Sequence, residues 1–395
     1  MFKRALIAIA VLLVAIGSGI AFYVYLMTQE RPELADAPAN YTCHFPEREA
    51  CEQANIWLQN LYEKHPVPSI SAALSLEGKT VWSATIGVAD IQQNIAAQAD
   101  TQYQIGSISK SLTAALTLKL QEQGKLNIHD NFQSYVKDFA ETNHASYTLA
   151  QLLSHRSGIR HYKDELSESL NETHYPTTRA AAEIVEEDAL VFRPGSDFLY
   201  SSYAYSVLAL ALEAATERSY VDLVEQELVS VLGLTHTTLN IARNTERYDE
   251  EKVSQKASPY LLLGSRLFAA PELDYSNKYA GAGFLSTPSD LLVFGNALLA
   301  HEYLSSSSVT QLFSTADSSS NYALGFRINN ANATHPENGP MIYHGGTING
   351  GYSFFALYPD KQGAIAFATN AVPSPPSSLD REESANTLLA FFTQQ

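Results

Sequence analysis

The chain has 395 residues, of which 45% are hydrophobic and 17% are charged. This composition is ordinary for a globular protein, and the length is sufficient for a large core divided between two subdomains. The net charge of −17 argues against nucleic acid or an anionic membrane surface as a partner.

Lys3 and Arg4 precede an apolar run from Ala5 to Met27. At about 1.5 Å per residue, one helix over this run would span roughly 34 Å, which is enough to cross a bilayer. The basic residues before the run predict that the N-terminus stays in the cytoplasm and that the body is exported, to the periplasm in a bacterium. We therefore expect residues 1–28 to form a signal-anchor helix. A signal peptide cleaved near Gly17–Gly19 is the alternative.

Residues 29–54 contain several prolines and mixed charges without a period, so they predict a linker. This linker holds the only two cysteines of the chain, Cys43 and Cys51. In an exported domain, two cysteines this close together predict a local disulfide. Two free thiols or a metal site are the alternatives, although His44 is the only further metal ligand close by.

Residues 55–392 predict a domain of mixed helices and strands. Apolar periodicity and cap signals, such as Thr287 before Pro288, predict helices over 51–64, 107–124, 147–154, 180–189, 203–216, 220–232, 288–299 and 381–393. The expected strands are 69–76, 80–88, 322–329, 341–344, 351–358 and 363–369. Residues 160–178 and 305–320 are expected loops, and residues 240–278 show no period and are expected to wrap the surface.

The order of these elements predicts an α+β fold. The strands near both ends of the domain can pair in one antiparallel sheet flanked by helices, built from about 55–125 and 280–392. The mainly helical part, about 126–279, would then be an insertion. The sequence contains no internal repeat, no Gly-x-Ser-x-Gly elbow, no phosphate-binding loop and no His-Glu-x-x-His motif.

The segment IGSISKSLTAAL carries the first candidate for chemistry, Ser107. Ser107 and Lys110 are three residues apart and share a helix face, so the lysine amine can act as the base that a serine nucleophile needs. The helix N-terminus favours developing negative charge, and burial would keep part of the lysine neutral. The same spacing recurs at Ser134–Lys137 in a polar stretch, so the spacing alone also allows a serine that merely caps a helix.

Tyr200 is the candidate for a second proton shuttle, because it lies just before the predicted helix 203–216. A phenol beside the ammonium of Lys110 would have a lowered pKa and could exchange protons near neutrality. The alternative is one tyrosine among 22 that simply packs in the core.

His344, Gly345, Gly346 and Thr347 follow one another at the end of a predicted strand. Glycines at such a place let a ligand approach the backbone closely. The amide of Thr347, together with that of Ser107, could hold an oxyanion, and His344 could donate to a substrate or tune the lysine. A turn with an incidental histidine is the alternative.

Five segments in order resemble the serine β-lactamase-related superfamily, which comprises class C β-lactamases, D-alanyl-D-alanine carboxypeptidases and esterases of the same fold. They are IGSISKSLTAAL, LLSHRSGI, YSSYAY, AGAGFLSTPSDLLVFGNALL and YHGGTING, and the resemblance covers roughly residues 55–392. Within the superfamily, SISK, LLSHRSGIRHY and YAGAGFLST are most similar to the mitochondrial β-lactamase-like serine protease and its bacterial relatives. The resemblance implies a β-lactamase/transpeptidase-like fold.

The resemblance also implies roles for the candidate residues. Ser107 would be the acylated nucleophile, and Lys110 would accept its proton. Tyr200 would relay protons to the leaving group and from the deacylating water. The amides of Ser107 and Thr347 would hold the oxyanion, and His344 stands where a lysine or histidine faces the site.

Gly346 belongs to the expected substrate-binding side of the site. Two other positions on that side depart from the family pattern. Ser202 replaces the asparagine whose amide grips a peptide or β-lactam side chain, and Gly345 replaces a threonine whose hydroxyl helps to bind a substrate carboxylate. Both changes weaken the β-lactamase and carboxypeptidase interpretations and leave acyl transfer intact.

We therefore expect a membrane-anchored serine hydrolase that acts on an amide or ester, with a peptide-like substrate as the first hypothesis. No metal and no cofactor are implied, and self-association is left open. The rivals are a D,D-carboxypeptidase or weak β-lactamase, an esterase, and a scaffold or filament protein with a vestigial site.

Overall fold

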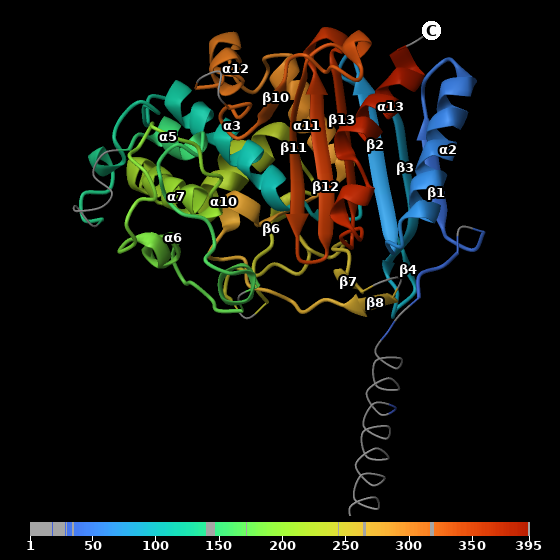
Figure 1. Ribbon diagram of the computed structural model, residues 1–395, viewed down its shortest axis with the longest axis horizontal. Coiled ribbons are helices and arrows are strands. Elements are labelled where there is room, and N and C mark those ends of the chain that lie inside the picture. Colours follow the sequence, from blue (N-terminus) through green and yellow to red (C-terminus); the bar gives the residue numbers. More distant parts are fainter. Residues whose placement is uncertain are drawn as a thin grey trace, which may run out of the picture.

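A computed structural model of the chain describes residues 28–393 except 29, 34, 140–146, 171, 244, 264–265 and 317–319, together with Ser18. Its main feature is an antiparallel sheet of order β1-β3-β2-β13-β12-β11-β10, with the short β4 paired to β3 (Figure 1). The strands are β1 Ala39–Cys43, β2 Ser69–Leu76, β3 Lys79–Asp90, β4 Ile95–Ala96, β10 Arg327–Asn329, β11 Met341–Ile348, β12 Gly351–Tyr358 and β13 Gly363–Thr369.

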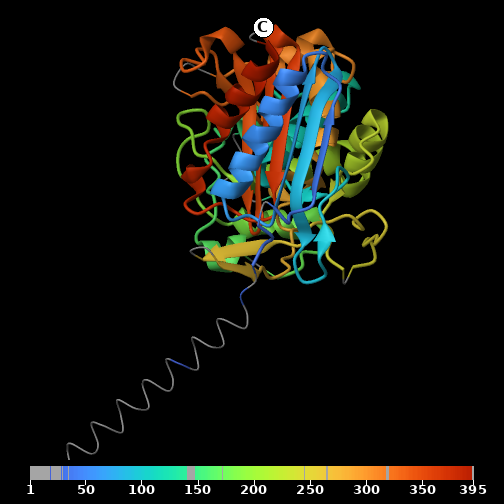
Figure 2. The ribbon, with the colours of Figure 1, turned by 90° about the vertical axis from the view of Figure 1, so that its right-hand side faces the viewer.

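The centre of the sheet is apolar on both faces, because every residue of β12 and β13 is buried. One face is covered by α2 (Arg48–Lys64) and α13 (Arg381–Thr393), which lie side by side (Figure 2). The other face is covered by α11 (Pro288–Leu299), whose Gly295 leaves room for the β12 side chains Phe355 and Leu357. A helix on each face satisfies the need of a two-sided apolar sheet to be covered.

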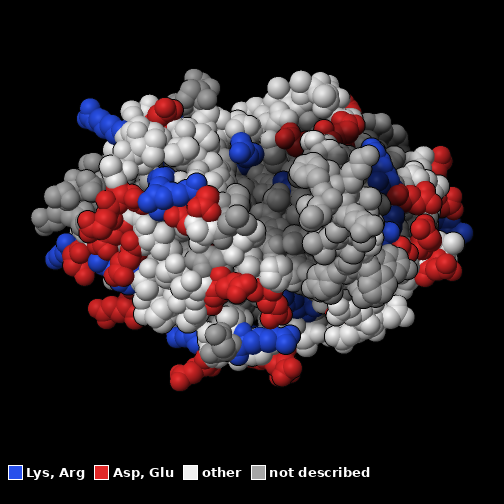
Figure 3. Space-filling view, turned by 60° about the horizontal axis from the view of Figure 1, so that its bottom comes forward, with Lys and Arg blue, Asp and Glu red and all other residues white. Residues whose placement is uncertain are grey.

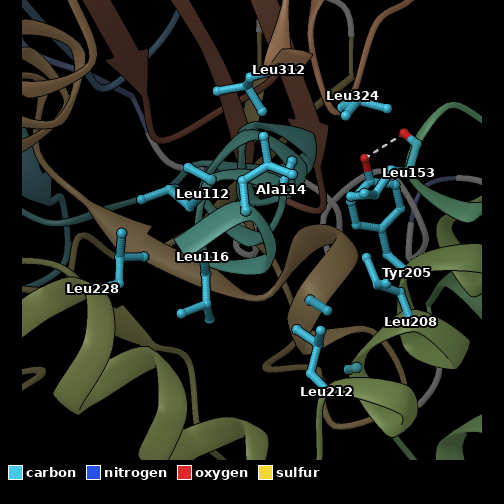
Figure 4. Packing of buried hydrophobic residues seen from close by; sticks show 14 of the residues in the cluster. Leu112, Ala114, Leu116, Leu153, Tyr205, Leu208, Leu212, Leu228, Leu312 and Leu324 are labelled. Atoms are coloured by element: carbon cyan, nitrogen blue, oxygen red, sulfur yellow. Dashed lines mark hydrogen bonds between the residues drawn. The ribbon is translucent and has the colours of Figure 1, made fainter. Parts of the chain in front are cut away.

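The mainly helical part packs around α3 (Ser109–Glu122), most of whose side chains are buried. Figure 4 shows Leu112 and Leu116 of α3 among leucines from other elements, including Leu208 and Leu228. The remaining helices are α5 Leu149–Leu153, α6 Thr178–Ala182, α7 Ser202–Thr216, α8 Tyr220–Leu223, α9 Ser230–Leu232, α10 Tyr279–Ala282 and α12 Ser306–Leu312, with π-helical turns at Glu165–Ser169 and Val224–Val229. Because α3 contacts both parts, it connects the helical core to the sheet.

Two smaller sheets complete the fold. One has the order β5-β9-β6 and consists of Tyr103–Gln104, Phe284–Ser286 and Thr238–Leu239. The other is a hairpin of β7 (Tyr260–Leu263) and β8 (Arg266–Ala269).

Much of the predicted secondary structure is confirmed. The hairpin of β2 and β3, the C-terminal strands β11, β12 and β13 and the helix capped by Thr287 all form, and the Thr287 side chain accepts from the amide of Asp290. The predicted linker is wrong in part, because residues 39–43 add β1 to the sheet edge and α2 begins at Arg48. Cys43 of β1 and Cys51 of α2 form the expected disulfide, with their Cα atoms 6.0 Å apart.

Three further predictions are wrong. Serines at 305–308 cap and begin α12 where a loop was expected, because Val309 and Leu312 bury an apolar face. Of the expected strand over 322–329 only β10 (Arg327–Asn329) forms, and Tyr322 meets Arg327 in an isolated bridge. The expected helix over 180–189 is only α6 followed by a short 3-10 turn to Val185.

Within the described ranges, no helix has the length and apolar character needed to cross a membrane. The predicted anchor over residues 5–27 lies outside those ranges except for Ser18.

Candidate active site

Ser107 lies in a short 3-10 turn, Gly106–Ile108, that leads directly into α3. Gly106 has φ +50°, in the left-handed region that glycine adopts without strain, and a Cβ on it would lie 3.0 Å from the backbone nitrogen of Thr347. The glycine therefore permits two things, the sharp entry into the helix and the close approach of β11. Ser107 itself is only partly buried, so its hydroxyl can be reached.

Lys110 is fully buried, and its Nζ lies within hydrogen-bond distance of three oxygen atoms. These are Ser107 Oγ at 3.2 Å, Ser202 Oγ at 3.1 Å and the carbonyl of Gly281 at 2.7 Å. Among the described residues no carboxylate pairs with this amine. Burial, together with the charge of Lys278, holds the pKa of Lys110 well below its ordinary value. The site therefore favours a neutral amine beside the Ser107 hydroxyl, which is the state a general base requires.

Tyr200 lies in the loop before α7, as expected, with its ring 4.7 Å from Lys110 Nζ. The expected lowering of its pKa by the lysine is wrong. Burial raises the pKa of Tyr200, and the interaction of its hydroxyl with Ser107 only partly opposes this. The phenol therefore stays protonated near neutrality, and it can serve as a donor to a leaving group that moves away from Ser107.

Ser202 is the first residue of α7, and its two polar groups hold the site together. Its hydroxyl accepts from Lys110, and its amide donates to Nδ1 of His161 at 3.2 Å. That contact fixes the proton of the neutral imidazole on Nε2. Burial and the charge of Lys110 lower the pKa of His161 to about 4, so the ring is neutral. Sequence reasoning missed His161, and its position within RHY gives no spacing signal.

His344 is buried in β11, and both of its ring nitrogens are engaged within the protein. Nδ1 donates to the carbonyl of Gly345 at 2.8 Å, and Nε2 accepts from the Tyr322 hydroxyl at 2.9 Å. Burial and the charge of Lys110 lower its pKa to about 3. The prediction that His344 donates to a substrate does not fit these contacts, and the ring instead fixes the strand beside the site.

Thr347, Gly346 and Gly345 lie along the same strand, with Thr347 exposed at its end. A guanidinium from the start of α13 fills the space beside them. Arg381 Nη2 donates to the carbonyl of Gly346 at 3.0 Å and to the Thr347 hydroxyl, and a Cβ on Gly345 would lie 2.1 Å from Arg381 Nη1. The missing threonine side chain at position 345 is therefore replaced in space by an arginine from a distant helix.

Arg381 is the second residue that sequence reasoning missed. It stacks on Tyr352, with the guanidinium carbon 3.6 Å from the ring centroid, and burial lowers its pKa. No acidic side chain pairs with it in the part of the chain that the structure describes. A cation held this way beside the predicted oxyanion amides is suited to bind an anionic group of a ligand.

The structure thus brings together five predicted residues from the turn before α3, from α3, from the loop before α7, from α7 and from β11. They are Ser107, Lys110, Tyr200, Ser202 and Thr347. No group of three or more His, Cys, Asp or Glu side chains gathers as metal ligands would within the described ranges.

Comparison with known proteins agrees with this geometry. A profile of the Beta-lactamase family matches residues 55–389. The chain is 29% identical over 317 residues to "Serine beta-lactamase-like protein LACTB, mitochondrial" of Homo sapiens, which covers 63% of this chain and 56% of that protein. The chain spans less than two thirds of the length of the mammalian relatives that it matches.

Two solved structures share the fold. The D-amino acid amidase from Ochrobactrum anthropi SV3, complexed with D-phenylalanine, superposes with a TM-score of 0.73 at 18% identity, covering 87% of this chain and 99% of that one. The D-alanine carboxypeptidase AmpC from Burkholderia cenocepacia superposes with a TM-score of 0.71 at 19% identity, covering the same shares of the two chains. The expected β-lactamase/transpeptidase-like fold is confirmed.

Proposed function

Since the chain belongs to the Beta-lactamase family, whose members are serine hydrolases, we propose that it hydrolyses an amide bond of a peptide-like substrate through an acyl-enzyme on Ser107. The observation that carries this proposal is the contact of Ser107 with Lys110, a fully buried amine whose lowered pKa leaves it able to accept a proton. A capping serine would need no such partner.

Acylation follows from these contacts. The proton of the Ser107 hydroxyl passes to the neutral Lys110 amine, and Oγ attacks the carbonyl carbon of the substrate. The amides of Ser107 and Thr347 stabilise the oxyanion. The proton returns through the Tyr200 hydroxyl to the leaving nitrogen, the carbon–nitrogen bond breaks, and the acyl group remains on Ser107 as an ester.

Deacylation uses the same groups in reverse. Water gives a proton through Tyr200 to Lys110 and attacks the ester carbon. The bond between that carbon and Ser107 Oγ breaks, and Oγ takes the proton back from Lys110. The product acid leaves, and the site returns to its starting protonation state, so no cofactor is needed to balance the reaction.

Arg381 supports a substrate that carries a carboxylate near the scissile bond, as a peptide end does. Its guanidinium lies along Gly345, Gly346 and Thr347 without an acidic partner among the described residues. An unpaired, partly buried cation is costly unless it binds an anion during function. This favours a peptide-like substrate over a neutral ester.

Two other enzyme activities remain candidates on specific observations. The similarity in fold to a D-alanine carboxypeptidase supports a D,D-carboxypeptidase or weak β-lactamase, although Ser202 lacks the carboxamide of the family pattern. An esterase needs only the nucleophile, base and oxyanion donors. A filament or scaffold protein with a vestigial site is the remaining rival, and the contacts of Lys110 argue against it.

We also propose that residues 1–28 anchor the enzyme in a membrane, with the catalytic domain outside the cytoplasm. The support is the apolar run that follows Lys3 and Arg4, and the disulfide between Cys43 and Cys51, which is typical of an oxidising compartment.

The test of the nucleophile is covalent labelling by a fluorophosphonate probe. Ser107→Ala should lose the label, whereas Ser134→Ala, an exposed serine with the same spacing to a lysine, should keep it. Labelling of the Ser107→Ala protein at full strength would overturn the assignment. The unsubstituted protein and the Ser134→Ala variant, which both keep Ser107, should then be assayed on D- and L-peptides, p-nitrophenyl esters and nitrocefin. Turnover of the peptides alone favours the proposal, and assembly without any turnover favours the scaffold.

A further inference from the structure

The outer face of the β7–β8 hairpin is an exposed apolar surface. Leu261 is 43% exposed and Leu263 is 71% exposed. Leu261 pairs with Phe268 across the hairpin, and Leu263 pairs with Arg266. Since residues that face each other across an antiparallel pair share one face, Leu261, Leu263 and Phe268 form a continuous apolar strip beside Arg266. We call these three residues the hairpin strip.

The opposite face of the hairpin fixes it to the domain. Tyr260 and Leu267 are buried in the core beneath the sheet, and Leu262 packs against the same core. The Tyr260 amide donates to the carbonyl of Asn370 at 2.9 Å, and its hydroxyl accepts from the Ile91 amide at 2.8 Å. The hairpin strip is therefore held outward by a rigid support, at the end of the sheet where Figures 1 and 2 show β7 and β8.

The same hairpin meets the residue at which the apolar N-terminal run ends. Arg266 Nη1 donates to Thr28 Oγ1 at 3.0 Å, and Met27 is the last residue of the run. Farther on, Arg31 lies over the Tyr62 ring at 4.0 Å, and the Tyr62 hydroxyl donates to the carbonyl of Pro32 at 2.8 Å. The chain thus contacts the domain at Thr28, Arg31 and Pro32, and the contact of Thr28 is with the hairpin itself.

These contacts limit the distance between the hairpin and a membrane that holds the apolar run. Thr28, the residue that follows the apolar run in the sequence, lies against the hairpin, and one residue spans at most about 3.6 Å. If residues 5–27 cross a bilayer, the surface of that bilayer lies at Thr28 and Arg266. A bilayer at Thr28 would then lie within reach of the hairpin strip, because Leu263 pairs with Arg266 across the hairpin.

We propose that the hairpin strip is a second membrane contact, at which Leu261, Leu263 and Phe268 enter the interfacial region of a bilayer held by the N-terminal anchor. The inference rests on the proposed anchoring. Leucine and phenylalanine gain from leaving water, and Arg266 can remain at the headgroup level. Because the net charge is −17 and Figure 3 shows acidic as well as basic side chains around this end, the fitting partner is a zwitterionic lipid surface.

The contact would also orient the active site. The turn after β11 packs on the segments that flank the hairpin, since Asn349 Nδ2 donates to the carbonyl of Pro271 at 3.0 Å and a Cβ on Gly350 would meet Pro259. Thr347, at the end of β11, therefore keeps a fixed relation to the hairpin strip. The membrane contact thus holds the predicted oxyanion amides close to the lipid surface, where a membrane-associated peptide substrate would be presented.

The test uses the full chain in phosphatidylcholine vesicles. Because both native cysteines are in a disulfide, Leu263→Cys supplies one thiol for an environment-sensitive fluorophore. The matched control is Val231→Cys, which is 55% exposed at α9 in the helical part. We expect the emission at position 263 to shift to the blue on vesicles and to be lost when the lipids carry a quencher. The emission at position 231 should change in neither respect.

The outcomes separate the two proposals. Vesicle flotation without shift or quenching at position 263 overturns the hairpin contact and leaves the anchor standing. Protein that does not float with vesicles overturns both. A third outcome is a blue shift at position 263 that grows with protein concentration in detergent and is not accompanied by quenching from lipid. This outcome overturns the lipid contact and indicates that a second copy of the chain covers the hairpin strip. The contact is supported if position 263 is quenched and if adding Leu261→Asp reduces this quenching while flotation with the vesicles stays unchanged.

Discussion

Arg160 and Arg381 are both partly buried arginines near the candidate site, but their surroundings differ. Arg160 donates to Glu168 at 2.8 and 3.1 Å and to Asp188 at 2.6 Å. Burial acts to lower its pKa, and the hydrogen bonds to the two carboxylates outweigh burial and raise it. Arg381 donates to a carbonyl and a hydroxyl and stacks on Tyr352, and no carboxylate among the described residues pairs with it, so burial lowers its pKa.

The difference distinguishes a structural cation from one available to a ligand. The neutralised Arg160 ties the loop after α5 to its neighbours, and removing it would take away the ion-pair partner of Glu168 and one of the two partners of Asp188. An arginine without a counter-charge keeps its capacity to bind an anion. Three other groups of the site resemble Arg381, since burial is the first cause of the lowered pKa of Lys110, His161 and His344.

The largest expected effect is at Lys110. Replacement by Met removes the amine that accepts the Ser107 proton, and we expect kcat/KM to fall about 10³- to 10⁴-fold. In the unsubstituted enzyme, activity should rise with pH through the lowered pKa of Lys110, because only the neutral amine is a base. Urea unfolding of the Lys110→Met protein serves as the control for folding. A variant that keeps its activity and its pH profile would exclude this lysine as the base.

The two arginines should respond differently to the same substitution. Arg381→Gln should lower kcat/KM for a peptide with a free carboxylate about 10- to 100-fold relative to its amidated analogue, since a charge-assisted hydrogen bond is lost. Arg160→Gln should leave that ratio unchanged and lower the free energy of unfolding by about 1–3 kcal/mol, because Glu168 loses its ion-pair partner while Asp188 keeps Lys163. Steady-state kinetics on the substrate pair and urea titrations distinguish the two. If both variants changed the ratio of the two kcat/KM values equally, the distinction between a structural Arg160 and a ligand-binding Arg381 would be wrong.

A smaller effect concerns the stability of the fold in acid. His344 has a pKa lowered from 6.5 to about 3, so the unfolded chain binds a proton there before the folded protein does. Its contribution is fully present above pH 6.5 and is lost as the pH falls toward the folded value. By about pH 5 the loss is on the order of 2 kcal/mol. His344→Gln should reduce this acid dependence in urea unfolding.

His335 provides the opposite case for that measurement. Burial acts to lower its pKa, but hydrogen bonds to Glu383 and Glu337 outweigh this and raise it. Its contribution is therefore present at low pH and is lost as the pH rises through the folded pKa. His335→Gln should make the acid dependence steeper. The same direction of change in both variants would contradict the assigned pKa shifts.

Local signals in the sequence were sufficient for several elements. The β2–β3 hairpin formed where alternating apolar runs flank Glu77-Gly78-Lys79, and α11 began at the cap that Thr287 and Pro288 predict. The pair Ser107 and Lys110 lies within one turn, so its contact depends on helix geometry alone. Such features involve neighbours along the chain, and short-range sterics and hydrogen bonds determine them.

Tertiary structure decided the rest, because it depends on contacts between distant segments. β13 pairs with β2 nearly 300 residues earlier, and that pairing closes the sheet. The same packing places Arg381 in the space left open at Gly345 and engages both nitrogens of His344. The sequence alone therefore indicated the family and predicted the residues that we propose as nucleophile and base. The protonation states of these residues and the position of Arg381 beside Gly345 depend on burial and long-range packing, which no local pattern reports.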